Sequence, residues 1–201
     1  MIEVIYNTTM NIFALDNNPI MAARALCDKH IVKMPVESAQ MLSTAHRVLD
    51  GSLYTELSKN NRKIKRWKLS DEREGLLYKA SFINHPCTQW TIFCHENYIW
   101  HSIHAKELCL EYSRRYGKTH GSQEVIDYCS FRIPENIRIG SQTHFARAMP
   151  DTYKNENGAV QSYRNYYLFE KANFAKWKNG NVPYWWSKKN IKTEENVVVT
   201  A

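Results

Sequence analysis

A row of polar side chains at helical spacing is the part of this sequence best suited to chemistry. Its members follow one another every three or four residues: Lys29, Lys33, Glu37, Gln40, Thr44 and Arg47. This spacing places them on one face of a helix, with the apolar residues on the opposite face. After Asp28, Glu37 is the only carboxylate in the row. A single acid among cations and amides is what a general acid or base above an anionic substrate needs.

Two histidines lie at the edges of this row, and they complete the set of catalytic candidates. The set is Glu37, His30, Lys33, Gln40 and His46. The simpler interpretation is a solvated helix face on which Lys and Glu side chains pair, because such spacing usually means that. The residues alone leave both interpretations open.

Basic and aromatic residues gather in three further places. Residues 59–68 (KNNRKIKRWK) carry six positive charges around one Trp, which favours phosphate contacts or a mobile, solvated loop. Arg115 and Lys118 lie near the C-terminus of a predicted helix, where they complement its dipole or clamp phosphates. Tyr163, Tyr167 and Lys171 share a face of the last predicted helix, which predicts either a base-stacking platform or a packed core. The nucleic-acid-binding candidates are Lys29, Arg47, Lys63, Lys65, Arg66, Arg115, Lys118, Tyr163, Arg164, Tyr167 and Lys171.

The composition favours a polyanionic partner. The 201 residues have a formal net charge of +7, and 12% of them are aromatic. Cations near phosphates release condensed counterions, and aromatic rings stack on bases, so nucleic acid is the expected partner. The N-terminus has acids and amides in place of a basic stretch and an apolar run. We therefore expect neither a signal peptide nor a membrane span.

Several other chemistries lack their motifs. The five cysteines are odd in number and contain no Cys-x-x-Cys pair, so we expect buried, reduced thiols. His101 and His104 are three residues apart but have no evident third ligand, so we expect no metal site and no cofactor. No Gly-rich phosphate loop, Gly-x-Ser-x-Gly elbow or paired Asp motif is present, which argues against an ATPase, an α/β-hydrolase or a two-metal nuclease.

The periodicity of apolar residues predicts a single, mainly α domain with long ordered loops over residues 1–186, followed by a loose tail at 187–201. Helices are predicted at 19–50, 87–116, 122–129 and 159–178, and Pro35 must restart or kink the first. Asn18 and Gly117 are expected to cap helices. Residues 4–15 are expected to form a short strand or an extended segment, and 52–80 and 131–158 to be irregular.

Seven short motifs spread over nearly the whole chain form a recognisable pattern. They are residues 27–34 (CDKHIVKM), 37–47 (ESAQMLSTAHR), 84–86 (NHP), 96–100 (ENYIW), 115–118 (RYGK) with His120, 148–151 (AMPD) and 163–167 (YRNYY). In these motifs the chain resembles a family of helical, DNA-glycosylase-like phage proteins linked to thymine hypermodification. Pro35 departs from the aliphatic residue expected there.

This resemblance implies a DNA-glycosylase-like fold and an enzyme acting in the cytoplasm of an infected bacterial host. Its substrate would be double-stranded DNA with a modified or damaged pyrimidine flipped out of the stack. We expect transfer of a free amino acid or amine to activated 5-hydroxymethyluracil, with loss of pyrophosphate. Glu37 or His30 would be the base, and Lys33, Arg164 and Lys171 would stabilise the departing charge.

Two alternatives stay open. In a DNA glycosylase that excises a modified or damaged pyrimidine, Glu37 would position water or stabilise a positively charged sugar. A non-catalytic DNA-binding accessory protein would have no need for a single acid amid the positive row.

Overall fold

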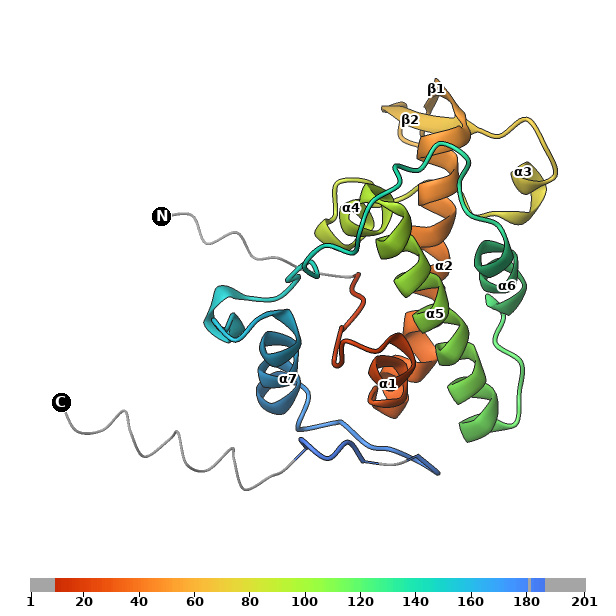
Figure 1. The fold of residues 1–201 in the computed structure, drawn as a ribbon. Coiled ribbons are helices and arrows are strands. Elements are labelled where there is room, and N and C mark those ends of the chain that lie inside the picture. Colours follow the sequence, from red (N-terminus) through yellow and green to blue (C-terminus); the bar gives the residue numbers. More distant parts are fainter. Residues whose placement is uncertain (1–9, 181, 187–201) are drawn as a thin grey trace.

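The protein is mainly helical, as the periodicity predicts. The computed structural model describes residues 10–180 and 182–186. Two long helices, α2 (Asp28–Asp50) and α5 (His95–Tyr116), pack side by side at its centre (Figure 1). Helix α1 (Pro19–Arg24) lies against α5, α4 (Pro86–Phe93) packs on both long helices, and α6 (Gln123–Phe131) covers their other side. The predicted tail at 187–201 lies outside the described residues.

The first predicted helix is in fact two. Asn18 caps α1 as expected, with its Oδ1 accepting from the backbone N–H groups of Ile20 and Met21. The chain then breaks at residues 25–27, before α2 begins at Asp28. Helix α2 runs unbroken through Pro35, so of the two expected alternatives, a restart or a kink, the restart is excluded. A proline removes only one helical hydrogen bond, and both Met34 and Pro35 are buried against the core, which holds the helix together.

The prediction of an irregular segment at 52–80 is wrong. Strands β1 (Ser52–Leu57) and β2 (Lys63–Lys68) form an antiparallel hairpin in which Ser52 pairs with Lys68 and Leu57 with Lys63. The left-handed backbone of Asn61 (φ 54°) closes its turn. Because the hairpin is mostly exposed, it lacks the apolar-to-polar alternation of a half-buried strand. The short helix α3 (Arg73–Leu76) follows.

The second predicted helix is also divided, because Cys94 is extended (φ −157°) and separates α4 from α5. Trp90, Trp100 and Leu108 are buried, whereas Phe93 and Ile103 are exposed. Gly117 caps α5 with φ 66°, which confirms its role. Helix α6 is confirmed.

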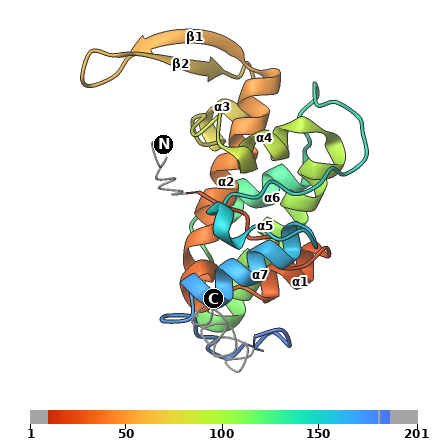
Figure 2. The same cartoon turned by 90° about the vertical axis from the view of Figure 1, so that its left-hand side faces the viewer.

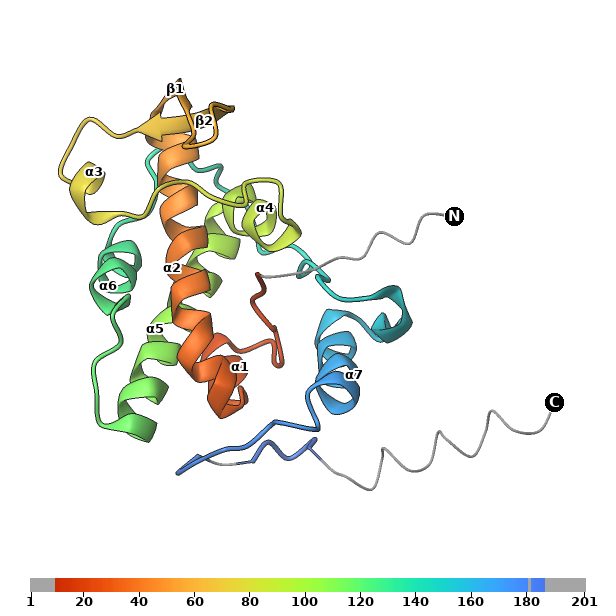
Figure 3. The ribbon, with the colours of Figure 1, turned by 180° about the vertical axis from the view of Figure 1, so that it is seen from behind.

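The C-terminal half follows the predicted outline, with a shorter last helix. Residues 132–150 form the expected long ordered loop, followed by the 3-10 turn η1 (Asp151–Tyr153). Helix α7 (Ala159–Glu170) ends eight residues earlier than predicted. Residues 10–15 form no strand, and residues 4–9 lie outside the described part. Residues 10–15 pass between α2 and α7, as the view from behind shows (Figure 3).

The buried residues form two clusters. One lies where residues 10–15 meet α1, α2 and α7, and the other lies between α2, α5 and α6. All five cysteines are buried and unpaired, which confirms the expectation of reduced thiols. Of the described helices, none is long and apolar enough to cross a membrane.

Candidate active site

Glu37 lies in the middle of α2, beneath the segment formed by residues 10–15. Its side chain is 6% exposed. Oε2 accepts a hydrogen bond from the backbone N–H of Asn11 (2.7 Å), and Oε1 lies 2.8 Å from Nζ of Lys33. The Lys33 side chain is 59% exposed. The arrangement is a buried carboxylate with a cation on its solvent side.

The surroundings of Glu37 act on its pKa in opposite directions. Burial is the largest influence and raises the pKa above its usual value of 4.5, because the charged form loses hydration. The hydrogen bond and charge of Lys33, and the N–H of Asn11, oppose this rise. Because burial outweighs the two donors, the carboxylate is a more effective proton acceptor than an exposed one.

Asn11 connects this acid to the long loop. Its Nδ2 donates to the carbonyl of Ala148 (2.8 Å), and its Oδ1 accepts from the N–H groups of Ile12 and Phe13. These bonds hold the Asn11 backbone so that its N–H points at Glu37. The sequence analysis missed Asn11 because no periodic pattern links it to a residue 26 positions later.

His30 lies in an aromatic cluster about two helical turns before Glu37 on α2. Its ring stacks on Phe13 (centroids 4.5 Å apart), and its Nδ1 hydrogen-bonds to the hydroxyl of Tyr167. Burial lowers the pKa of His30 to about 3, and the charges of Lys171, Lys33 and Lys29 add to this effect. His30 is therefore a neutral imidazole at physiological pH.

Three lysines lie around the buried His30, closer to the surface of the protein. Lys29 lies over the ring of Phe174 (4.5 Å to the centroid), and Lys171 lies over the ring of Tyr166 (4.3 Å). Lys33 is the third. All three act on His30 electrostatically, so they belong to one positive field. We call Lys29, Lys33 and Lys171 the cationic rim. A rim of this kind attracts phosphates.

The other two catalytic candidates differ in position. Gln40 is partly exposed, one turn beyond Glu37 on the same face of α2. His46 is fully buried, with Nε2 bonded to the Tyr98 hydroxyl (2.8 Å) and Nδ1 near Arg73 (3.3 Å). Because these partners form a structural network in the second cluster, we leave His46 out of the site.

Several DNA-binding candidates are structural residues. Arg47 is buried and donates to the carbonyls of Tyr78, Trp67, Glu74 and Leu77 and to the Glu74 carboxylate. Arg115 is likewise buried and donates to Glu111, Asp28 and two carbonyls of α1 and the turn after it. Neither guanidinium can reach a phosphate without abandoning these bonds.

The predicted stacking platform on α7 is not available to bases. Tyr163 and Tyr167 are 1% and 0% exposed, so their rings belong to the core. Tyr163 donates to the carbonyl of Ala146 (2.8 Å). Arg164 donates to the carbonyl of Leu15 (2.9 Å), and its guanidinium lies over the rings of Tyr184 and Trp185. The burial favours the alternative interpretation, a packed core helix.

Among the DNA-binding candidates, the cations that remain accessible lie on the cationic rim, on the hairpin and after α5. Lys63 and Lys65 are exposed on β2, Lys118 is exposed after Gly117, and Arg66 pairs with Glu56 (2.7 Å). The hairpin stands out from the helical body at the end of α2 (Figure 2). Its lysines are therefore placed to contact a long ligand that also crosses the rim.

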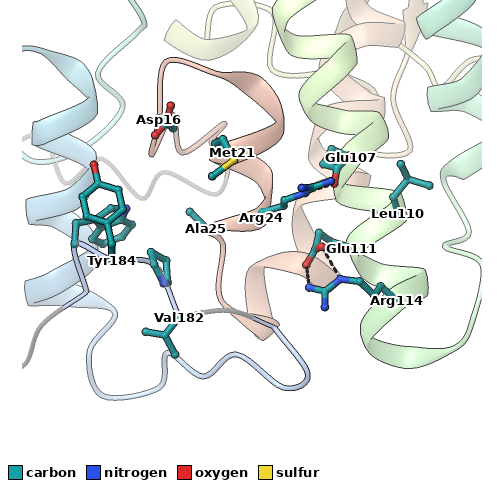
Figure 4. A pocket seen from close by; sticks show the side chains of 12 residues that line it. Asp16, Met21, Arg24, Ala25, Glu107, Leu110, Glu111, Arg114, Val182 and Tyr184 are labelled. Atoms are coloured by element: carbon teal, nitrogen blue, oxygen red, sulfur yellow. Dashed lines mark hydrogen bonds and ion pairs between the residues drawn. The ribbon is translucent and has the colours of Figure 1, made fainter.

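A cavity of about 590 Å³ lies elsewhere, between α1, α5 and residues 182–185 (Figure 4). Its charged walls are already paired, Arg24 with Glu107 and Arg114 with Glu111. It shares no residue with the Glu37 site. Across the described chain, no cluster of three or more His, Cys, Asp or Glu side chains could hold a metal ion.

The chain belongs to the pyrimidine dimer DNA glycosylase family, whose model matches residues 10–124. The family consists of DNA glycosylases, enzymes that act on DNA. The match includes the segment that covers Glu37, all of α2 and the hairpin, and it ends before α7. It supports the glycosylase alternative better than the expected transferase. No curated protein and no solved structure matches the chain.

Proposed function

We propose that this protein is a DNA glycosylase that excises a damaged pyrimidine from duplex DNA, with Glu37 as its catalytic carboxylate. The substrate to test first is the pyrimidine dimer that the family description names. The observation that carries the proposal is the position of Glu37. It is the buried acid held between Lys33 and the Asn11 N–H, at the inner edge of a cationic rim.

The reaction breaks the bond between C1′ of the sugar and N1 of the pyrimidine. The bonding electrons leave with the base, and positive charge develops on the sugar. The Glu37 carboxylate stabilises that charge and accepts a proton from the water that adds to C1′. The departing base takes up a proton, and an abasic sugar remains. A single damaged pyrimidine is released as a free base, whereas a base of a pyrimidine dimer stays covalently joined to its partner base.

The depth of Glu37 requires the target nucleotide to leave the helix. The carboxylate lies beneath Lys33 and residues 10–15, so a stacked base pair cannot touch it. A flipped nucleotide reaches it when the exposed Lys33 side chain moves aside toward a phosphate. Lys29 and Lys171 then hold the flanking phosphates, and Lys63 and Lys65 bind the duplex further along.

The test compares wild type, Glu37→Gln and Glu124→Gln on a duplex with one pyrimidine dimer. Mass spectrometry follows the products with and without added free amino acids. Loss of a general base typically costs about 10²–10⁴ in rate, so Glu37→Gln should lose that factor and still bind DNA. Glu124 is exposed on α6, and its variant should behave as wild type.

Three results would contradict the proposal. If Glu37→Gln excises at the wild-type rate, the site is assigned wrongly. A heavier nucleoside formed only with added amine would establish the transferase. DNA binding by the wild type with no chemical change, on dimer or modified-pyrimidine duplexes, would indicate the accessory protein.

A further inference from the structure

Phe82 is an exposed aromatic residue with an unusual backbone. Phe82 is 52% exposed, and its backbone φ is 49°, in the left-handed region that non-glycine residues rarely adopt. Within the described part of the chain, Phe82 makes no contact with another aromatic ring. The ring is therefore held out by the backbone and not by side-chain packing on other rings.

The segment that carries Phe82 is fastened on both sides. The Ser81 N–H donates to Oγ1 of Thr44 on α2 (3.1 Å), and that hydroxyl donates to the carbonyl of Gln40 (2.7 Å). On the other side, the His85 N–H donates to the carbonyl of Phe82 (2.9 Å) as the chain turns into α4. These bonds make Phe82 the tip of a rigid turn.

This turn is attached to the same face of α2 that bears Glu37. Thr44 lies seven residues after Glu37, which is nearly two helical turns and about 10 Å along the axis. Successive nucleotides of one strand are spaced by about 3.4 Å, so the distance from Glu37 to Thr44 corresponds to roughly three base steps. The length of the Phe82 side chain is not included in this distance. Gln40 lies between the two positions. If a nucleotide is flipped toward Glu37, the space that it leaves in the duplex would be within reach of Phe82.

The other phenylalanine with positive φ provides an internal comparison. Phe13 has φ 52°, but its ring is buried and stacks on His30, so packing compensates for the strained backbone. Phe82 has the same kind of strain with half of the residue in solvent. A strained backbone that holds an apolar ring in solvent points to a contact made only in a complex. Proteins that open DNA insert apolar side chains of this kind between base steps.

We propose that Phe82 enters the duplex and fills the space left by the extruded pyrimidine. The inference rests on the proposed function, because it presumes that a nucleotide is flipped toward Glu37. Phe82 would act by holding the DNA open, so it is a positioning residue. The Phe82 ring would stack in the vacated position while Glu37 acts on the sugar.

The experiment uses a dimer in a fully paired duplex and the same dimer in an unpaired bubble. Phe82→Ala should lower the single-turnover rate on the duplex by about tenfold or more, because unstacking is no longer compensated. On the bubble, the rate should change by no more than about twofold, because no stacked pair has to be opened. Phe82→Leu should recover most of the duplex activity. Phe131→Ala, which removes an exposed ring on α6, should match wild type.

A second measurement separates this inference from the proposed function. A 2-aminopurine beside the lesion brightens when its neighbour unstacks, whether or not excision follows. Wild type and Glu37→Gln should both raise the fluorescence on binding, and Phe82→Ala should not. Equal loss of activity on both substrates, or a rise in fluorescence on binding of Phe82→Ala as large as with wild type, would overturn the role of Phe82. No excision of the bubble dimer by wild type would instead count against the proposed function.

Discussion

Mild acid should destabilise this protein, because its buried histidines are held neutral. Burial lowers the pKa of His30 and His101 to about 3 and that of His46 to about 4. His104 is fully buried and its pKa is also lowered. In the unfolded chain these groups return to about 6.5. The unfolded state then binds more protons than the folded state below pH 6.5, so stability falls as the pH falls from there toward 3 or 4.

The size of the effect follows from the shifts. Each such histidine removes about 1.4 kcal/mol of folding free energy per pH unit below 6.5, hence about 2 kcal/mol at pH 5. His30, His46 and His101 together remove roughly 6 kcal/mol at pH 5, which is comparable with the whole stability of a typical domain. Asp50 and Glu111 have lowered pKa values, but their loss begins only near the unfolded carboxyl pKa of about 4. The four buried histidines therefore dominate the interval from pH 6.5 to 5, and the raised pKa of Glu37 opposes them only in part.

The sharpest test is His104→Phe. The His104 ring stacks on Trp100 (5.1 Å between centroids), and neither ring nitrogen has a hydrogen-bond partner in the described chain. Phenylalanine therefore removes the titrating group without breaking a hydrogen bond. Urea unfolding between pH 5 and 6 should show a slope of free energy against pH that is smaller by about one proton, or about 1.4 kcal/mol per unit.

Replacing the exposed His144 by Gln serves as the matched control, and its slope should equal that of wild type. If the free energy of unfolding of the wild type is the same at pH 7 and pH 5, the buried histidines do not govern its acid stability. If the slope of His104→Phe equals that of wild type, His104 is not one of the groups that titrate on unfolding.

Two further predictions concern DNA binding and catalysis. Lys63→Ala combined with Lys65→Ala should reduce the slope of log K against log salt concentration by about 1.8 in magnitude, as DNA-binding titrations at several salt concentrations would show. The single-turnover rate at saturating DNA should not change. A control with Lys106→Ala and Lys154→Ala should keep the wild-type slope. The excision rate should fall as the pH drops toward the raised pKa of Glu37, because the carboxylate form is the active one, and His30, with a pKa of about 3, should add no second step. A pH–rate profile checks this, and a profile that rises toward low pH would contradict the role of Glu37 as base.

The central helix of the site was predictable because its pattern is local. The spacing of Lys33, Glu37 and Gln40 put them on one face, and the structure has that face on α2. The cap at Gly117 was predictable for the same reason, since a glycine after a helical run satisfies the last turn. The hairpin at β1 and β2 escaped prediction because exposed strands carry no apolar period.

The roles of the arginines and tyrosines were not predictable from spacing. Arg47 and Arg115 sit at positions that suit a phosphate contact, yet each is buried among carbonyls of distant segments. Tyr163 and Tyr167 have the spacing of a stacking platform, but residues 10–15 and the neighbouring core cover them. Amphipathic side chains serve either purpose, and only their neighbours decide which.

The sequence by itself determined that a lone carboxylate, Glu37, stands among cations on a helix, because helical geometry depends on neighbours three and four residues away. Only the tertiary structure decided that this carboxylate is buried, that the N–H of Asn11 points at it, and that Lys171 joins Lys29 and Lys33 in the cationic rim around His30. Those features depend on contacts between segments far apart in the chain. Burial and charge, which decide the reactivity of an acid, arise from such contacts.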